Sequence, residues 1–135
     1  MKKKDTKSDH KERINEVMYH IYKNLSTKLV IEDLAQISSY SVFHFQRIFK
    51  EIANKSVVNY IKDLRLQWAA NLLIFNPEST ITDIAHGCGL KSSATFTNEF
   101  KKYFGMTPSF WRKGGYEKYK KENPLTNEKE VDFSK

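Results

Sequence analysis

An internal repeat constrains the fold of this chain more than any other feature of its sequence. Shifting residues 31–35 by 50 positions, and residues 45–60 by 51, places similar residue types on one another. The matched pairs are Ile31 and Ile81, Asp33 and Asp83, Leu34 and Ile84, Ala35 and Ala85, Phe45 and Phe96, Phe49 and Phe100, Lys50 and Lys101, Ser56 and Thr107, and Tyr60 and Trp111. One extra residue in the second copy accounts for the change of register, so the chain contains two similar units.

Each copy has the periodicity of two amphipathic helices, with apolar residues at three- and four-residue steps. In the first copy the pattern predicts helices over residues 31–38 and 42–53, and it places Leu34, Ala35 and Ile37 inward in the shorter helix. A short helix, a tight break and a longer helix form the layout of a helix-turn-helix. The sequence therefore predicts two helix-turn-helix units.

A long amphipathic stretch at residues 57–75 separates the two copies. Nineteen residues in one helix give a rod of about 28 Å, and Asn76-Pro77 ends it because the residue before a proline is pushed out of the helical region. One turn of DNA measures about 34 Å. The stretch is therefore expected to be a rigid spacer that sets a distance comparable with one turn of DNA.

Capping residues support the predicted helix ends. Thr80 with Asp83 three residues later favours a helix start, and Pro108 suits the first turn of a closing helix that runs to about residue 113. Asn54 and Gly105 follow the longer helix of each copy, and both residue types tolerate the left-handed conformation found past a helix end.

These observations divide the chain into five segments. A further helix is predicted from Arg13 to about residue 25, and the residues before it show no periodicity. The expected order is a flexible basic arm at residues 1–11, a first helix-turn-helix unit at 12–56, a linker helix at 57–76, a second helix-turn-helix unit at 77–113, and a charged extension or linker at 114–135.

The net charge indicates what kind of partner the protein binds. The formal net charge is +7, and the segment between the two ends is itself basic, as expected for a protein that binds a phosphate-rich partner. The alternative is that the charge serves solubility alone.

Cys88 is the only cysteine, which excludes a disulfide framework and a cysteine-based zinc site. With no apolar run that resembles a membrane span or a secretory signal, the sequence predicts a cytoplasmic protein.

The longer helix of the first copy presents residues suited to reading base edges. With Phe45 and Phe49 inward, its outward face carries Phe43, Gln46 and Arg47. Arginine can pair in bidentate fashion with guanine and glutamine with adenine, while an aromatic ring can pack on a thymine methyl group. A solvated helix face is the alternative for one helix alone, but the repeat and the basic charge favour readout.

The second copy offers smaller side chains for the same purpose. Its outward face carries Ser93, Ala94, Thr97 and Asn98, so we expect mainly phosphate anchoring and shape reading there, with Asn98 as the best candidate for a base contact. Hydroxyls near helix starts and outward lysines are candidates for phosphate contact. These candidates are Ser41, Lys50, Ser56, Ser92, Lys101 and Thr107.

Other residue types give weaker indications. His44 falls between the inward and outward faces and is expected to be a packed or hydrogen-bonded histidine. His86 and Cys88 lie two residues apart but have too few neighbouring ligands for a metal site, and no phosphate loop or catalytic triad is present. We expect no cofactor, no metal and no enzymatic activity. Two rivals remain, namely a helical module that docks on an acidic protein through its basic face and an enzyme that uses His86 or Cys88.

Three stretches together resemble a known family. Residues 31–61, the sequence LRLQWAANLL and the sequence ITDIAHGCGLKSSATFTNEFKKYFGMTPSFWRK resemble the DNA-binding domain of AraC/XylS-type bacterial transcription regulators, over about residues 12–113. The resemblance implies an all-α fold of seven helices, with two helix-turn-helix subdomains joined by a long central helix and placed in adjacent major grooves of double-stranded DNA. It also implies a transcription activator that contacts RNA polymerase, and base contacts at Phe43, Gln46, Arg47, Ser93, Ala94, Thr97 and Asn98.

Some features of the family vary between its members. Many carry an effector-binding domain, and the resemblance extends to a subgroup in which that domain follows the DNA-binding part, which implies a possible effector-binding domain C-terminal to this chain.

This sequence departs from the family pattern at three places. Asn54 and Val57 stand where the family usually has Gly and Pro, Asn98 stands where several stand-alone members have Arg, and the turn before Tyr40 reads Ile-Ser-Ser where a Gly is common.

Overall fold

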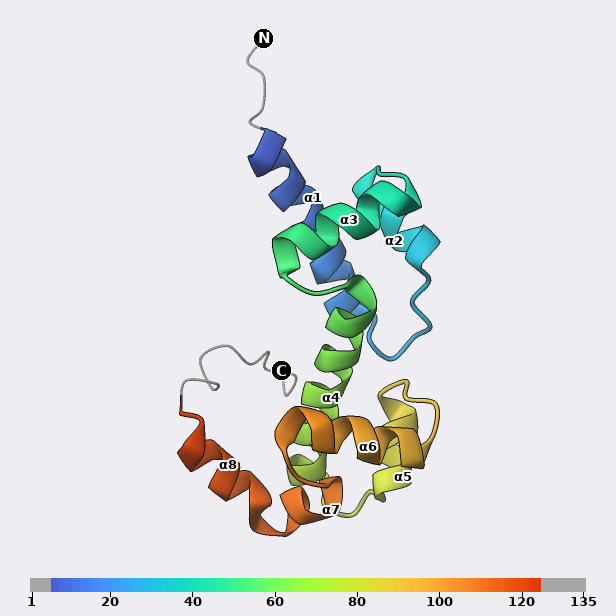
Figure 1. The fold of residues 1–135 in the computed structure, drawn as a ribbon. Coiled ribbons are helices and arrows are strands. Elements are labelled where there is room, and N and C mark those ends of the chain that lie inside the picture. The colour runs from blue at the N-terminus through green and yellow to red at the C-terminus, as the bar shows by residue number, and fades with distance from the viewer. Residues whose placement is uncertain (1–5, 125–135) are drawn as a thin grey trace. The chain divides into compact units, whose positions relative to one another are not determined.

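The computed structural model describes residues 6–124, which form helices joined by turns without any strand. The predicted all-α fold is confirmed (Figure 1). In chain order the helices are α1 (Thr6–Lys23), α2 (Ile31–Ser38), α3 (Val42–Ala53), α4 (Val57–Phe75), α5 (Ile81–Gly87), α6 (Ser93–Phe104), α7 (Pro108–Phe110), the π-helical turn η1 (Trp111–Gly115) and α8 (Tyr116–Glu122). No helix in the described part of the chain is both long and apolar enough to cross a membrane.

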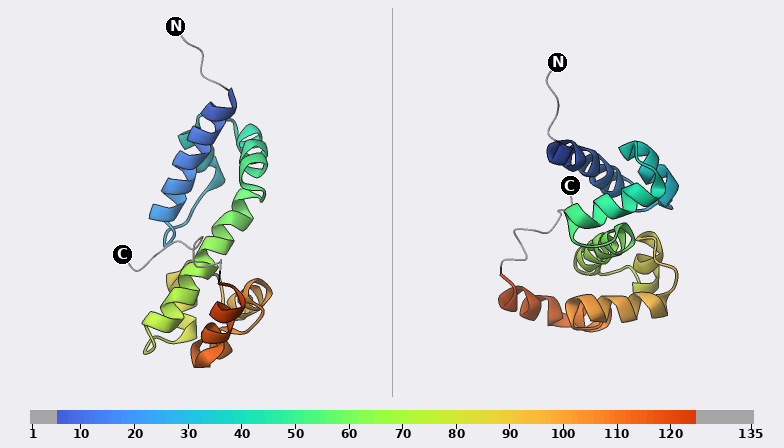
Figure 2. Two further views of the ribbon diagram at one scale, coloured as in Figure 1. Left: turned by 90° about the vertical axis from the view of Figure 1, so that its left-hand side faces the viewer. Right: turned by 45° about the horizontal axis from the view of Figure 1, so that its top comes forward.

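The helices belong to two compact units, Met1–Lys62 and Asp63–Lys135, whose boundary falls within α4. In the first unit α1 packs against α2 and α3 (Figure 2). The core of this unit is formed by apolar side chains from all its helices. Its buried members are Ile14, Val17, Ile21, Leu25, Leu34, Ala35, Phe45, Ile48, Phe49, Val57 and Ile61.

The second unit has its own core between the later part of α4 and the helices that follow it. The core residues are Leu66, Ala69, Ala70, Leu73, Ile84, Ala85, Cys88, Phe96, Phe100, Phe104 and Trp111. The indole Nε1 of Trp111 donates a hydrogen bond of 3.0 Å to the carbonyl oxygen of Ala70. This bond satisfies the one polar group of a side chain that is otherwise packed among aromatic rings.

The repeat seen in the sequence is also present in the burial of its residues. Residues 31–40 and 81–90 share the same order of buried, half-buried and exposed positions. One sequence prediction fails in this segment, because Ile37 is 36% exposed while Ser38 is buried. The Ser38 hydroxyl donates a hydrogen bond of 2.7 Å to the carbonyl oxygen of Ala35, so a small polar side chain is satisfied inside the core.

Both units use left-handed backbone at the same two places. Asn54 and Gly105 end α3 and α6 with φ of 63° and 79°, as predicted. In the turns between the paired helices, Ser39 and Gly89 have φ of 62° and 81°. Left-handed backbone costs an L-residue such as Ser39 about 1–2 kcal/mol relative to its usual conformation, so contacts around the first turn have to compensate for it.

The N-terminal helix is longer than the sequence pattern predicts. Helix α1 begins at Thr6, so residues 6–11 belong to it rather than to a flexible arm. The added turns are polar and are held by polar contacts, among them an ion pair of 3.1 Å between Asp9 and Arg13. A search for apolar periodicity does not detect such contacts. Residues 1–5 of the expected arm lie outside the described residues.

The segment after the second unit's closing helix is also more ordered than predicted. Where a frayed extension or linker was expected, α8 follows a break at Gly114, whose φ is 127°. The rings of Tyr116 and Tyr119 each lie 5.2 Å from the ring of Trp111. Together with a contact between the rings of Phe104 and Tyr119 at 5.4 Å, these aromatic contacts hold a helix whose other residues are mostly charged. Residues 125–135 lie outside the described part.

Arg112 fixes the loop between α4 and α5 through three carbonyl oxygens. Its Nε donates to Leu73 at 2.9 Å, its Nη1 to Ser79 at 2.8 Å and its Nη2 to Asn76 at 3.0 Å. Because the guanidinium group is planar and carries donors on all three nitrogens, one side chain satisfies the carbonyls of a helix end and of the loop that follows.

We expect Arg112→Met to lower the free energy of unfolding by about 2–4 kcal/mol, because it keeps the aliphatic stem and removes three hydrogen bonds that the charged guanidinium group donates to carbonyl oxygens. Urea unfolding followed by circular dichroism measures the change. Lys113→Met is the matched control, since Lys113 is exposed and should change stability by no more than about 0.5 kcal/mol. Equal effects of the two substitutions would contradict this role of Arg112.

Candidate nucleic-acid interface

Helix α3 is oriented by two phenylalanines that leave its opposite face in solvent. Phe45 and Phe49 are fully buried, and their rings pack edge to face with centroids 5.8 Å apart. On the other side of the helix, Phe43 is 78% exposed and Gln46 and Arg47 are exposed as well. Phe43 is the most exposed large hydrophobic side chain among the described residues, so its ring is accessible to a partner.

Helix α6 repeats this geometry with smaller outward side chains. Phe96 and Phe100 are fully buried, with ring centroids 5.5 Å apart. Ala94 and Asn98 are exposed, whereas Ser93 and Thr97 are half-buried. The candidate base-contact residues thus lie on one helix in each unit, and those of α6 are in part less exposed than those of α3.

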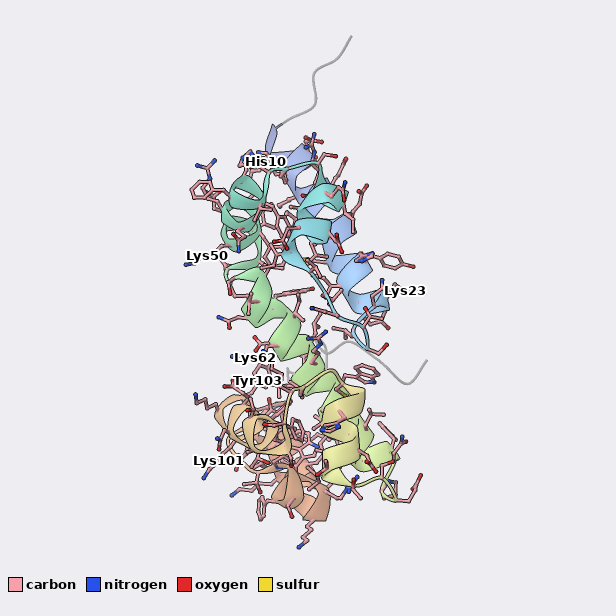
Figure 3. The ribbon with its side chains drawn as sticks, turned by 90° about the vertical axis from the view of Figure 1, so that its right-hand side faces the viewer. His10, Lys23, Lys50, Lys62, Lys101 and Tyr103 are labelled. Atoms are coloured by element: carbon pink, nitrogen blue, oxygen red, sulfur yellow. The ribbon has the colours of Figure 1, made fainter. Side chains whose placement is uncertain are left out.

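One lysine extends from the outer face of each of these helices. Lys50 is exposed on α3 and points away from α1, and Lys101 is exposed on α6 and points away from α4 and α5 (Figure 3). Neither helix has an acidic residue in its first turn. The partial positive charge at each helix N-terminus is therefore not neutralised by a carboxylate of that turn.

The four candidate hydroxyls for phosphate contact are all N-caps. Each side-chain oxygen accepts a hydrogen bond from the backbone N–H three residues later. The pairs are Ser41 with His44 at 3.2 Å, Ser56 with Asn59 at 3.2 Å, Ser92 with Thr95 at 3.1 Å and Thr107 with Phe110 at 3.2 Å. These hydroxyls are thus held at helix starts, where backbone N–H groups and the helix dipole favour an anion.

The two residues of the enzyme alternative, His86 and Cys88, are not both accessible to a substrate. His86 is exposed at the end of α5, whereas Cys88 is fully buried. Burial raises the pKa of the Cys88 thiol to about 12, and the nearby positive charge of Arg65 offsets this only in part. A thiol with so high a pKa is a poor nucleophile at neutral pH. Within residues 6–124, no group of three His, Cys, Asp or Glu side chains is placed to hold a metal ion.

Comparison with known proteins identifies the family. A helix-turn-helix domain family matches residues 34–114, which is more than half of the chain. The TetD protein of transposon Tn10 from Escherichia coli is 34% identical over 109 residues, which cover 81% of this chain and 78% of TetD. The chain belongs to the AraC/XylS-type family of transcription regulators.

Further relatives and one solved structure resemble this AraC/XylS-type chain. The transcriptional activator AarP of Providencia stuartii is 34% identical over 99 residues, which cover 73% of each chain. The DNA-binding domain of AdpA, solved in complex with a target DNA, has the same fold, with a TM-score of 0.70 at 21% identity over 83% of this chain and 96% of that one. The chain spans only 39% and 32% of two longer regulators that it matches, from Streptococcus mutans and Bacillus subtilis. The chain is a DNA-binding transcription regulator.

We expect Cys88 to react very slowly with a thiol reagent in the folded protein. With a pKa of about 12, the thiolate fraction near pH 8 is on the order of one in ten thousand, and the side chain is also out of contact with solvent. Absorbance after addition of an aromatic disulfide reagent measures the reaction. The same protein in concentrated urea is the control and should react fully within minutes. Rapid reaction without urea would contradict the buried position.

Proposed function

We propose that this regulator reads the sequence of double-stranded DNA with α3 and α6, residues 42–53 and 93–104, in two adjacent major grooves, and that it activates transcription. The observation that carries the proposal is the exposed face of α3, where Phe43, Gln46 and Arg47 follow directly on a capped helix start. In helix-turn-helix proteins, residues near the N-terminus of the second helix contact base edges.

The three α3 residues differ in what they would read. The guanidinium group of Arg47 suits bidentate pairing with guanine, and the amide group of Gln46 suits adenine. The exposed ring of Phe43 would pack on a thymine methyl group and lose its contact with water in doing so. Each bidentate pair discriminates between bases by about 1–3 kcal/mol.

In the second unit the proposed base contacts are weaker. Ser93, Ala94, Thr97 and Asn98 are short, and Ser93 and Thr97 are half-buried, so this unit would read mainly groove shape and thymine methyl groups. Asn98 is the one exposed amide among them. We propose it as the base contact of α6.

Phosphate contacts would come from the capped helix starts and from two lysines. Ser41, Ser56, Ser92 and Thr107 sit at N-termini whose backbone N–H groups favour anions. The lysines, Lys50 and Lys101, extend from the outer faces of α3 and α6. Such contacts fix register on the duplex without carrying sequence information directly.

Two further parts of the proposal are the reading of two grooves and the activation of transcription. Each unit by itself presents the outer face of one such helix, α3 in the first and α6 in the second, which supports the reading of two grooves. The relative AarP is a transcriptional activator, which supports activation and hence RNA polymerase as a partner. The rival function is a helical module that docks on an acidic protein through its basic residues.

Selection of bound fragments from random duplexes tests the proposal. We expect one preferred sequence, a protected footprint of about two helical turns, and an affinity that falls steeply and log-linearly with salt. The rival predicts no preferred duplex. A footprint of a single turn would retain DNA readout and contradict the two-groove part.

Replacing Arg47 and Lys50 in turn should distinguish a residue that contacts bases from one that contacts phosphate. We expect Arg47→Ala to weaken binding to the selected duplex by about 1–3 kcal/mol and to relax preference at one base pair, with little effect on random duplex. Lys50→Ala serves as the comparison. It should weaken binding to the two duplexes alike and reduce the slope of log affinity against log salt concentration by about one. Titrations over a range of salt concentrations measure both. An equal loss for Arg47→Ala on the two duplexes would contradict its role in readout.

A further inference from the structure

The added N-terminal turns of α1 are tied to the turn that leads into α3. We call the four side chains involved the His10–Tyr40 cluster, which consists of His10 and Arg13 from α1, Tyr40 from the turn and His44 from α3. The Nδ1 atom of His10 is hydrogen-bonded to the Tyr40 hydroxyl, and the two ring centroids are 5.5 Å apart. His10 lies where α1 meets the start of α3 (Figure 3).

The rings of the cluster reach the first turn of α3 directly. The His44 ring packs edge to face on Tyr40, with centroids 4.8 Å apart, and lies 6.1 Å from His10. Tyr40 immediately precedes Ser41, the N-cap of α3, and His44 directly follows Phe43. Contacts from α1 therefore act on the part of α3 that carries the proposed base-reading side chains.

Arg13 contacts the same turn through both the turn's backbone and the Tyr40 ring. Its guanidinium carbon lies 5.0 Å from the centroid of Tyr40, and its Nη1 donates a hydrogen bond of 3.3 Å to the carbonyl oxygen of Ser38. Its Nε pairs with Asp9 at 3.1 Å. These contacts surround Ser39, whose left-handed conformation is costly for a residue with a side chain. The turn is thus held from outside by α1.

The second unit has no equivalent of these rings at the matching positions. The 50-residue shift places Leu90 on Tyr40, and the 51-residue shift places Thr95 on His44. Leu90 packs on the apolar core, and the Thr95 hydroxyl accepts a hydrogen bond from Ser92. The cluster belongs only to the unit whose outward face carries Arg47 and Gln46.

We infer that His10 and Tyr40 are positioning residues for base readout, because they fix the direction in which the first turn of α3 leaves the turn before it. This inference rests on the proposed function. Bidentate hydrogen bonds weaken steeply once their angles deviate, so a small reorientation of α3 would cost specificity before it costs folding or phosphate contact. His10 and Tyr40 themselves need not touch DNA.

The test compares His10→Ala and Tyr40→Phe with the unaltered protein on three kinds of probe. These are the duplex selected from random fragments, a random duplex of equal length, and single-base variants of the selected duplex. We expect the ratio of specific to random affinity to fall by about three- to tenfold, the loss that corresponds to one hydrogen bond. Preference should flatten only at the bases read by α3. Affinity for random duplex should stay unchanged, and urea unfolding should show no more than the small loss of stability that one hydrogen bond accounts for.

Two further variants separate positioning from a merely structural role. His10→Gln retains a hydrogen-bonding group that can reach the Tyr40 hydroxyl and should restore most of the lost preference. Asn15→Ala removes a polar side chain from an exposed position of the same helix and should change nothing. The double variant His10→Ala with Tyr40→Phe should be no worse than the more affected single variant, because both remove one interaction.

The outcomes distinguish this inference from the function on which it rests. An unaltered protein without preference for any duplex would overturn both. A preferred duplex that His10→Ala still discriminates as well as the unaltered protein does would overturn only the inference. So would a loss of preference that appears together with a lower unfolding free energy and weaker binding to random duplex, since that pattern indicates general destabilisation.

Discussion

Each unit depends on one pair of phenylalanines placed four residues apart in its second helix. Phe45 and Phe49 in α3, and Phe96 and Phe100 in α6, are fully buried with their rings edge to face. Turning either helix about its axis would bring these rings into water at about 1.5–3 kcal/mol for each side chain. Apolar burial, not the charged residues, therefore decides which face of each helix is presented outward.

The two units meet the same backbone requirements with different residues. Ser38 and Cys88 are both buried, one through a hydrogen bond to Ala35 and the other as a small apolar group. Ser39 and Gly89 adopt the same left-handed conformation, and only the serine has to be compensated by contacts around it. In the first unit, contacts next to Ser39 come from Arg13 of α1, which donates a hydrogen bond to the Ser38 carbonyl oxygen and packs its guanidinium group on the Tyr40 ring.

The sequence predicts much of this architecture because burial is periodic. The bounds of α2, α3 and α4 agree with the pattern of apolar residues and helix-ending residues, and the outward positions of α3 follow once Phe45 and Phe49 are placed inward. The first turns of α1 and the whole of α8 could not be predicted this way, since His10 is held by Tyr40, and Tyr119 by Trp111. Such contacts join residues of different helical segments, so the apolar periodicity within one helix gives no sign of them.

The shared burial order of residues 31–40 and 81–90 has an evolutionary consequence. Two copies that keep the same interior while their surfaces diverge can change binding target one half at a time. Substitutions at exposed positions of α6 such as Ala94 and Asn98 need no compensating change in the aromatic core beneath them. Under the proposed function, a duplicated fold of this kind can acquire a preference for a new operator through single substitutions that each leave a folded protein.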